Sequence, residues 1–223
     1  MLKSIDTNLW TVDRPFGRLF GSIGTRMTVI KLADGGLFLH SPVKLDPELR
    51  AALDQLGPVR FVTAPNRAHH LFVRDYIGAF PEASIFAAPG LPEKRKDLNF
   101  HGVLGDEPPA GWAGQIDQHL FGGALFLNEV DFFHRATRTL LLTDVAFGER
   151  INDEFWTRAF YLMTSCPSFG PHRMMRLIIR DHEAARKSVQ RIIQWDFDRV
   201  IMTHGKIVES GGRERFAEAF SYL

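Results

Sequence analysis

Short apolar runs separated by turn-forming residues open the chain. The runs RMTVIKL and LFLHSP flank an Asp-Gly-Gly turn, which predicts a β-hairpin over about 26–41. The next segment, LDPELRAALDQLG, has leucines at helical spacing, with Asp46 placed to cap, Pro47 in the first turn and Gly57 at the end. These signals predict a helix between Asp46 and Gly57.

Strand and helix patterns then alternate. VRFVTA and SIFAA predict buried strands, and HLFVRDYIGAF predicts a helix between them that begins at a pair of histidines. LNEVDFFH and TLLLTDVAF predict a second hairpin, DHEAARKSVQRIIQW and GGRERFAEAF predict helices, and DRVIMTHG predicts a last strand. Residues 90–118 are irregular and predict a loop, whereas 153–165 and 171–180 have helical patterns.

This order of elements predicts an α/β (α+β) fold with a mixed sheet layered with helices. The chain has 223 residues, 45% of them hydrophobic, which suits one domain with a sizeable core. We therefore expect a single domain over 1–223 with a helical insert at about 153–180.

Charge and cysteine content narrow the function classes. The 27 basic residues nearly balance the 26 acidic ones, which argues against a nucleic-acid-binding protein. Cys166 is the single cysteine, so neither an internal disulfide nor a cysteine-built zinc site can form, and a reducing compartment is expected. The N-terminal sequence lacks the apolar core of a signal peptide, and no later run reaches membrane-spanning length. We expect a cytoplasmic protein that does not bind membranes.

Three predicted strands end in polar clusters, with the sequences TAPNRAHH, LLTDVAF and MTHGK. In open α/β sheets, ligands gather at the carboxyl ends of strands. If these three ends lie together, His69, His70, Asp144 and His204 meet at one edge. The sequence therefore predicts a candidate site from these four side chains.

The register of the second predicted hairpin provides an independent argument. If residues 135–138 form a four-residue turn, Glu129 lies directly opposite Asp144, where two like charges repel. A divalent cation or an arginine between the carboxylates would remove the repulsion. A slip of one residue would instead turn Glu129 to the other face, and solvent exposure of Glu129 is the alternative interpretation.

Several phrases make the sequence similar to a known group of proteins: RMTVIKLADGGLFLHSP, APNRAHH, GLPEKRKDL, NEVDFFHRATRTLLLTD and WDFDRVIMTHG. The chain resembles the metallo-β-lactamase-like hydrolase superfamily, and within it a bacterial and plant branch catalogued as a domain of unknown function. The resemblance spans nearly the whole chain. It implies one metallo-β-lactamase-like domain, an αββα sandwich of two mixed sheets with helices outside and a metal site at one sheet edge.

The resemblance also implies a partial ligand set. In the superfamily signature H-x-H-x-D-H, the final histidine matches His70, and the aspartate position holds His69. The later aspartate of the superfamily matches Asp144 in LTD, and its last histidine matches His204 in THG. These four residues correspond to one half of the usual two-metal site.

The other half of the signature is missing. Pro65 and Arg67 stand where the superfamily has its first two histidines, and Glu129 is the nearest candidate for the absent middle histidine. The resemblance therefore implies a single divalent ion held by His69, His70, Asp144 and His204. Three imidazoles and a carboxylate suit zinc first, with iron or manganese as alternatives.

The first functional hypothesis is a metal-dependent hydrolase. Asp144 and Glu129 are its candidate catalytic residues, with Asp144 binding the ion or orienting water and Glu129 acting as a ligand or general base. A small-molecule ester, lactone, thioester or phosphoester would be the substrate. The 153–180 insert would either cover the site or form a homodimer surface.

The second hypothesis needs no metal. Arg67 would pair with Asp144 and Glu129, leaving a catalytically silent protein that binds a small ligand or a protein partner. Adjacent histidines at a helix start diverge by about 100°, so His69 and His70 could share an ion only where the backbone is not helical. Asn66 has two candidate roles, orienting substrate or forming an Asx-type turn, and the turn is favoured.

Overall fold

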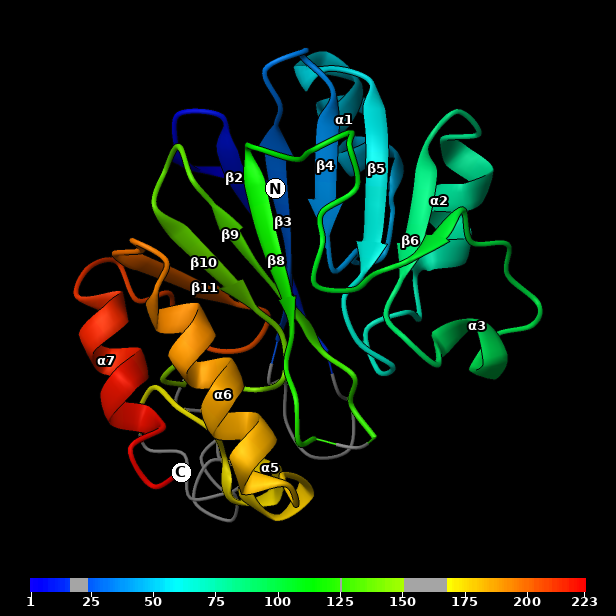
Figure 1. Ribbon diagram of the computed structural model, residues 1–223. Coiled ribbons are helices and arrows are strands. Elements are labelled where there is room, and N and C mark those ends of the chain that lie inside the picture. Colours follow the sequence, from blue (N-terminus) through cyan, green and yellow to red (C-terminus); the bar gives the residue numbers. More distant parts are fainter. Residues whose placement is uncertain (17–23, 125, 151–167) are drawn as a thin grey trace.

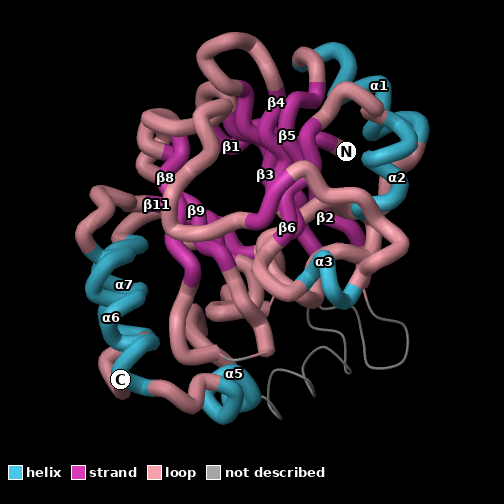
Figure 2. Tube along the Cα trace, turned by 45° about the vertical axis from the view of Figure 1, so that its right-hand side comes forward, coloured by secondary structure: helices cyan, strands magenta, loops and turns pink. Residues whose placement is uncertain are grey.

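Two mixed β-sheets pack face to face in the computed structural model, and helices cover their outer sides (Figure 1, Figure 2). The structure describes residues 1–16, 24–124, 126–150 and 168–223. The helices coloured cyan and green in Figure 1 lie beside one sheet, and the orange and red helices lie beside the other. The αββα sandwich that the resemblance implies is confirmed.

The larger sheet has seven strands in chain order, antiparallel from the first to the fourth and parallel from the fourth to the seventh. Its strands are β1 (Leu2–Asp6), β2 (Leu9–Arg14), β3 (Thr25–Lys31), β4 (Leu37–His40), β5 (Val59–Ala64), β6 (Ser84–Ala87) and β7 (Gly102–Val103). The helices between these strands are α1 (Pro47–Leu56), α2 (Val73–Ala79) and α3 (Leu91–Lys94). The predicted hairpin, the first helix and both buried strands are confirmed.

The smaller sheet has the strand order β11-β10-β9-β8, with β10 and β11 parallel and the other neighbours antiparallel. Its strands are β8 (Ile116–Leu120), β9 (Val130–His134), β10 (Thr139–Leu142) and β11 (Arg199–Met202). The C-terminal helices are α5 (Arg173–Ile178), α6 (His182–Ile193) and α7 (Gly212–Ala219). Asp181 caps α6 as its sequence predicts, since its Oδ1 accepts the amide of Ala184.

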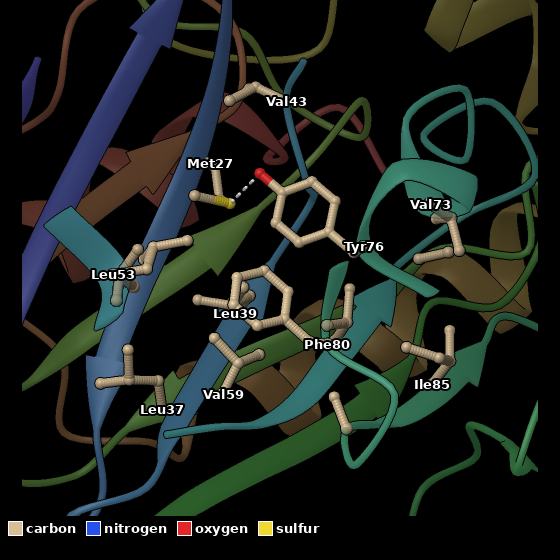
Figure 3. Close-up of a cluster of buried hydrophobic side chains, with 14 of the residues drawn as sticks. Met27, Leu37, Leu39, Val43, Leu53, Val59, Val73, Tyr76, Phe80 and Ile85 are labelled. Carbon is tan, nitrogen blue, oxygen red and sulfur yellow. Dashed lines mark hydrogen bonds between the residues drawn. The ribbon is translucent and has the colours of Figure 1, made fainter. Parts of the chain in front are cut away.

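Apolar side chains form three layers of core. Under α1 and α2, Tyr76 packs against the larger sheet, and its hydroxyl contacts the Met27 sulfur at 3.3 Å (Figure 3). Between the sheets, the Phe38 ring lies 5.1 Å from Trp112 and 5.6 Å from Phe132. A third core lies beneath α6 and α7. These layers fix the two sheets against each other, so the ends of their strands meet at defined positions.

The hairpin register matches its prediction. His134 pairs with Thr139, and Phe132 pairs with Leu141, around a turn in which the Arg138 amide donates to the Arg135 carbonyl. Continuing this register brings residue 129 beside residues 143–145. The two predicted carboxylates therefore start from neighbouring backbone positions.

Two boundaries differ from the predictions. The predicted loop at 90–118 contains α3, β7 and the start of β8, because Gln118 occupies a buried position of β8 and interrupts its apolar pattern while accepting a hydrogen bond from the Trp112 indole. The α2 helix begins at Val73, after the histidine pair. Of the predicted insert, residues 151–167 lie outside the described ranges. No helix in the described part of the chain is long and apolar enough to cross a membrane.

Candidate metal centre

Three of the four predicted ligands converge where strands of the two sheets end. His69 follows β5, Asp144 follows β10 and His204 follows β11, and one ligand atom of each lies within 4.8 Å of the others. The two histidine Nε2 atoms are 3.2 Å apart. The carboxylate of Asp144 is 3.4 Å from each of them, through Oδ2 to His69 and Oδ1 to His204.

Backbone and hydroxyl groups hold both imidazoles in place. His204 Nδ1 lies 2.7 Å from the Gly24 carbonyl, which can only accept, so Nδ1 carries a proton and Nε2 faces the cluster. His69 Nδ1 lies 2.8 Å from Ser41 Oγ, leaving its Nε2 directed at the cluster. Sequence reasoning did not identify Ser41 or Gly24, because neither residue type signals a ligand support without knowledge of its neighbours.

The strand end that carries His204 is fixed to the larger sheet by Arg26. One guanidinium nitrogen of this buried β3 residue donates to the carbonyls of Met202 at 2.7 Å and Gly205 at 2.9 Å. Met202 lies two residues before His204, and Gly205 follows it directly. The contact therefore sets the position of His204 relative to the sheet that carries His69.

Asn66 combines the predicted turn with a second role that sequence reasoning missed. Its Oδ1 accepts the amides of Ala68 and His69, both at 2.8 Å, which forms the Asx-type turn. Its Nδ2 donates to Glu129 at 3.1 Å and to Asp144 at 2.7 Å. The amide thus lies between the two carboxylates, where sequence analysis expected a cation or an arginine.

Glu129 is fully buried, so the solvent-exposed alternative is wrong. Its carboxylate accepts the backbone amides of Thr143 at 2.6 Å, Asp144 at 2.7 Å and Val145 at 3.1 Å. With Asn66, four N–H groups surround it, so its oxygens are occupied by protein donors. The structure places Glu129 beneath the cluster as a support of the Asp144 loop.

Arg67 does not occupy the place that the second hypothesis gives it. Its side chain lies beside Gly90 and Asn128, and among the described residues it forms no ion pair with Asp144 or Glu129. The Arg67 Nε is buried and without a hydrogen-bond partner among the groups described. The Asp144 carboxylate is instead compensated by His69, His204 and Asn66, so the Arg67 part of that hypothesis is corrected.

His70 lies outside the cluster. Its Nδ1 is 2.8 Å from an Arg95 guanidinium nitrogen, which can only donate, so this imidazole nitrogen accepts. Burial lowers the pKa of His70 to about 4, and the charges of Lys94 and Arg95 add to the effect. The backbone at the pair is not helical, yet His70 contacts Arg95 while His69 faces His204 and Asp144.

The electrostatics of the two carboxylates differ. Burial alone would raise the pKa of Asp144, but the charges and hydrogen bonds of His69 and His204 outweigh burial and hold this pKa well below its usual range. Burial and the charge of Asp144 raise the pKa of Glu129 to about 7, against the opposing effect of its amide donors. Asp144 is therefore the ionised group that faces the histidines.

His40 lies in the interior near the site without joining it. Its ring makes an edge contact with Phe132 at 5.4 Å, and its Nε2 is buried with no partner among the described groups. Burial, with a smaller effect of His69, lowers the pKa of His40 to about 3. The ring is consequently neutral at physiological pH.

The donor set fits a single divalent ion. With ligand bonds of about 2.0–2.2 Å, two ligands of a tetrahedral ion lie roughly 3.3 Å apart. The two Nε2 atoms, 3.2 Å apart, match that edge, and each lies 3.4 Å from a different oxygen of Asp144. Two imidazoles and one carboxylate leave a fourth position open, which is typical of catalytic rather than structural zinc sites, and the same set also suits iron.

A cavity of about 220 Å³ opens beside the cluster. His69, Asp144 and His204 form one side of it. Its other described lining residues are mostly apolar: Phe16, Thr25, Pro42, Ala68, Leu71, Phe72 and Phe147. The cavity therefore gives a small molecule access to the three side chains.

Comparisons with known proteins place this geometry in a family and a fold. The family profile described as "Domain of unknown function (DUF4336)" matches residues 6–154, a range that contains His69 and Asp144 and ends before His204. A comparison with curated protein sequences finds no significant match.

Solved structures match over the whole chain. The DIM-1 metallo-beta-lactamase exposed to ceftazidime matches at a TM-score of 0.68 and 15% identity, over 100% of this chain and 96% of that chain. The metallo-beta-lactamase FIM-1 from Pseudomonas aeruginosa, in its mono-zinc form, matches at 0.67 and 10% identity, over 100% and 95%. The metal-soaked Flv1 flavodiiron core from Synechocystis sp. PCC6803 matches at 0.68 and 12% identity, over 100% and 60%. At these identities the likeness establishes the fold.

Proposed function

The chain belongs to the DUF4336 family, and we propose that it is a metal-dependent hydrolase with one divalent ion held by His69, Asp144 and His204. The observation that carries the proposal is the convergence of two imidazole Nε2 atoms and a carboxylate at separations of 3.2–3.4 Å. Zinc is the first candidate, and iron or manganese are the alternatives. The fold of the metallo-beta-lactamase and flavodiiron neighbours supports the metal-binding part.

A bound divalent ion would supply a water of lowered pKa and polarise a carbonyl or phosphoryl oxygen. The protein's own residues would orient the ligands. Ser41 and Gly24 fix the planes of the two imidazoles, and Asn66 holds one oxygen of Asp144. The oxygens of Glu129 accept four N–H groups, so this residue supports the loop of Asp144. We therefore assign it no general-base role.

The apolar cavity beside the cluster favours a small substrate with an uncharged, apolar portion. Phe72, Phe147 and Leu71 would contact that portion while the scissile group faces His69, Asp144 and His204. Carboxylic esters, lactones and thioesters fit this arrangement better than phosphoesters, because a phosphoester adds negative charge beside Asp144.

Metal content tests the proposal directly. Protein purified without chelator is expected to contain nearly one equivalent of zinc, iron or manganese by mass spectrometry, and His69→Ala and His204→Ala to lose it. His134→Ala, which removes a buried histidine outside the cluster, is the matched control and should retain the metal. Metal-free protein whose thermal stability does not respond to added metal would reject the proposal and support the catalytically silent alternative.

A hydrolytic screen tests the substrate class. An ester, lactone and thioester series of increasing acyl length should be hydrolysed by the metal-loaded protein, and removal of the ion should abolish turnover. Retained turnover in the metal-free His204→Ala variant would contradict the assigned role of the cluster.

A further inference from the structure

A second cavity lies at the turn of the β9–β10 hairpin, at the opposite end of this hairpin from the metal cluster. Its volume is about 610 Å³, which is within the range of small-molecule binding sites. The β1–β2 turn, dark blue in Figure 1, and the β9–β10 turn both line it. Two of its polar lining residues, His134 and Gln115, each have a hydrogen-bonding group that the protein does not use.

Three hydrogen bonds fix the proton of the His134 ring on Nδ1. The Thr139 hydroxyl donates to the Thr137 carbonyl at 3.1 Å, and the Thr137 hydroxyl donates to Thr139 Oγ1 at 2.9 Å. Each hydroxyl has a single proton, so Thr137 Oγ1 can only accept from His134 Nδ1, which lies 2.8 Å away. The arrangement that satisfies all three contacts therefore places the ring proton on Nδ1.

The other ring nitrogen of His134 is an unused acceptor. His134 is 4% exposed, and its Nε2 has no hydrogen-bond partner among the described residues. Burial lowers the pKa of His134 to about 4, against the opposing charge of Asp6, so the ring is neutral and Nε2 carries a lone pair. Unlike the Nε2 of His40, this atom is not sealed in the interior. Because His134 lines the cavity, the lone pair is available to a molecule bound there.

Gln115 provides a donor in the same cavity. Its Oε1 accepts the Ala33 amide at 2.7 Å, and this amide can only donate, so the orientation of the side-chain amide is settled. The NH2 group of Gln115 has no partner among the described residues. The cavity wall thus holds one acceptor and one donor, each oriented by a hydrogen bond within the protein.

The charged groups that line the cavity already have partners. Asp6 accepts from Arg199 at 2.9 Å, and Arg135 forms two hydrogen bonds of 2.7 Å with Asp117. Lys31 Nζ donates to a backbone carbonyl at the end of α1, at 2.7 Å. An ionic ligand would have to compete with these contacts, whereas a neutral ligand would leave them intact. The cavity therefore favours a neutral, polar molecule.

We propose that this cavity binds a neutral polyol, a molecule such as a monosaccharide with hydroxyl groups on adjacent carbons. One hydroxyl donates to His134 Nε2, and a second accepts from the NH2 group of Gln115. A hydroxyl can do either, so a diol satisfies both protein groups at once. Small lining residues, Ala33, Gly114 and Ala136, leave room for the carbon skeleton. This site is separate from the metal cluster and goes beyond the proposed hydrolase.

Nitrogen-15 NMR of histidine-labelled protein tests the acceptor directly. The spectrum of the free protein should show His134 with a protonated Nδ1 and an unprotonated Nε2. Millimolar glucose should shift the Nε2 resonance, because the lone pair gains a hydrogen bond, and should leave Nδ1 protonated. A ring proton on Nε2, or an Nε2 resonance that glucose, glycerol and myo-inositol all leave unmoved, would overturn the proposal.

Two substitutions test the assigned contacts. His134→Phe keeps a ring and removes the acceptor, and Gln115→Glu keeps the oxygen that accepts the Ala33 amide and removes the N–H donors. Each should weaken glucose binding about 10-fold, because one ligand hydroxyl loses its partner. His182→Phe, at an exposed histidine of α6, is the matched control and should bind glucose as wild type does.

Thermal unfolding shows which of these variants are folded, and Gln115→Glu, at a partly exposed residue, tests the site even if His134→Phe does not fold. Unchanged glucose affinity in the folded variants would contradict the proposal. So would tighter binding of acetate or inorganic phosphate than of glucose, since the site would then select anions. The metal cluster lies at the other end of the hairpin, so these outcomes are separate from those of the metal measurements.

Discussion

The two ends of the β9–β10 hairpin both hold buried histidines near threonines or acids, yet they differ in where the hydrogen-bond partners come from. At the turn, His134 Nδ1 bonds Thr137 at 2.8 Å, and Thr137 bonds Thr139. At the open end, histidine partners come from distant parts of the chain: His204 and Gly24 are 180 residues apart, and His69 and His204 are 135 residues apart. Convergence of distant segments, rather than a buried histidine, distinguishes the candidate site.

The larger of the two cavities lies at the turn of the hairpin, away from the three candidate ligands. The cavity at the turn has a volume of about 610 Å³ against about 220 Å³ beside the cluster. Its charged lining residues are engaged elsewhere: Arg135 pairs with Asp117, and Lys31 donates to the Leu56 carbonyl. The smaller cavity is the one that meets three ligand atoms facing a common point. The residues that line a cavity, rather than its volume, therefore identify the open end as the candidate site.

Removing one histidine from each end should give the largest contrast. His204→Ala deletes a proposed ligand, so metal affinity should fall more than about 100-fold, beyond the loss typical of supporting residues. His134→Ala should leave metal affinity within about twofold and lower only stability. Isothermal titration with zinc measures both. Equal losses of metal affinity in the two variants would show that the open end of the hairpin is not the metal site.

A change at Asn66 should test the open end next. Asn66→Asp removes the N–H donor between Glu129 and Asp144 and places a third acid beside these two, which should cost about 2–4 kcal/mol of the free energy of unfolding. Chemical denaturation at neutral pH measures it. Thr137→Val, at the turn, is the control and should cost about 1 kcal/mol. An Asn66→Asp cost no larger than that of the control would show that the amide bridge is dispensable.

Acid should destabilise both ends through neutral buried histidines. Burial lowers the folded-state pKa of His40 to about 3 and of His134 to about 4, whereas both titrate near 6.5 when unfolded. As pH falls below about 6.5 the unfolded chain binds protons that the folded chain does not, so stability is complete above that pH and is lost progressively down to the folded-state values. Between pH 7 and 5, each histidine should contribute about 2 kcal/mol to this loss.

Substitution separates the two acid effects. His40→Leu and His134→Leu should each flatten the stability profile between pH 7 and 5, and the double variant should flatten it further. Urea unfolding at successive pH values gives the profile. A wild-type slope that survives in the double variant would assign acid sensitivity to other groups.

Ser41 should give the smallest and most selective effect. Ser41 has φ of 56°, a left-handed conformation that favours glycine, and its hydroxyl bonds His69. Ser41→Ala and Ser41→Gly should both weaken metal binding by about 10-fold. Ser41→Gly should be about 1 kcal/mol more stable than Ser41→Ala, because it relieves the backbone strain. Unequal metal affinities in the two variants would implicate the backbone instead of the hydroxyl.

Periodicity and turn residues allowed most of the fold to be predicted. The Asp46 cap, the Asp-Gly-Gly hairpin and the Arg135–Arg138 turn each depend on residues adjacent in sequence. The β8 strand was missed because Gln118 places a polar group in the interior, where the Trp112 indole and the carbonyls of Gly105 and Glu107 satisfy it. Local patterns fail where a buried polar side chain depends on partners outside its own strand.

The sequence predicted most residues of the candidate site but not the arrangement of their side chains. Strand-end position pointed to His69, Asp144 and His204, and the hairpin register pointed to Glu129 beside Asp144. The divergence of His70 toward Arg95, and the use of Asn66 instead of Arg67 between the acids, depend on side-chain directions in a loop.

The late position of β11 in the chain has a consequence for how an ion would be acquired during biosynthesis. Two of the three converging side chains leave the ribosome long before His204, and β11 docks at the edge of its sheet beside β10. A nascent or truncated chain lacking β11 offers only His69 and Asp144, a pair that competing chelators would strip readily. Tight retention of an ion would thus report that the final strand has docked and the whole topology is in place.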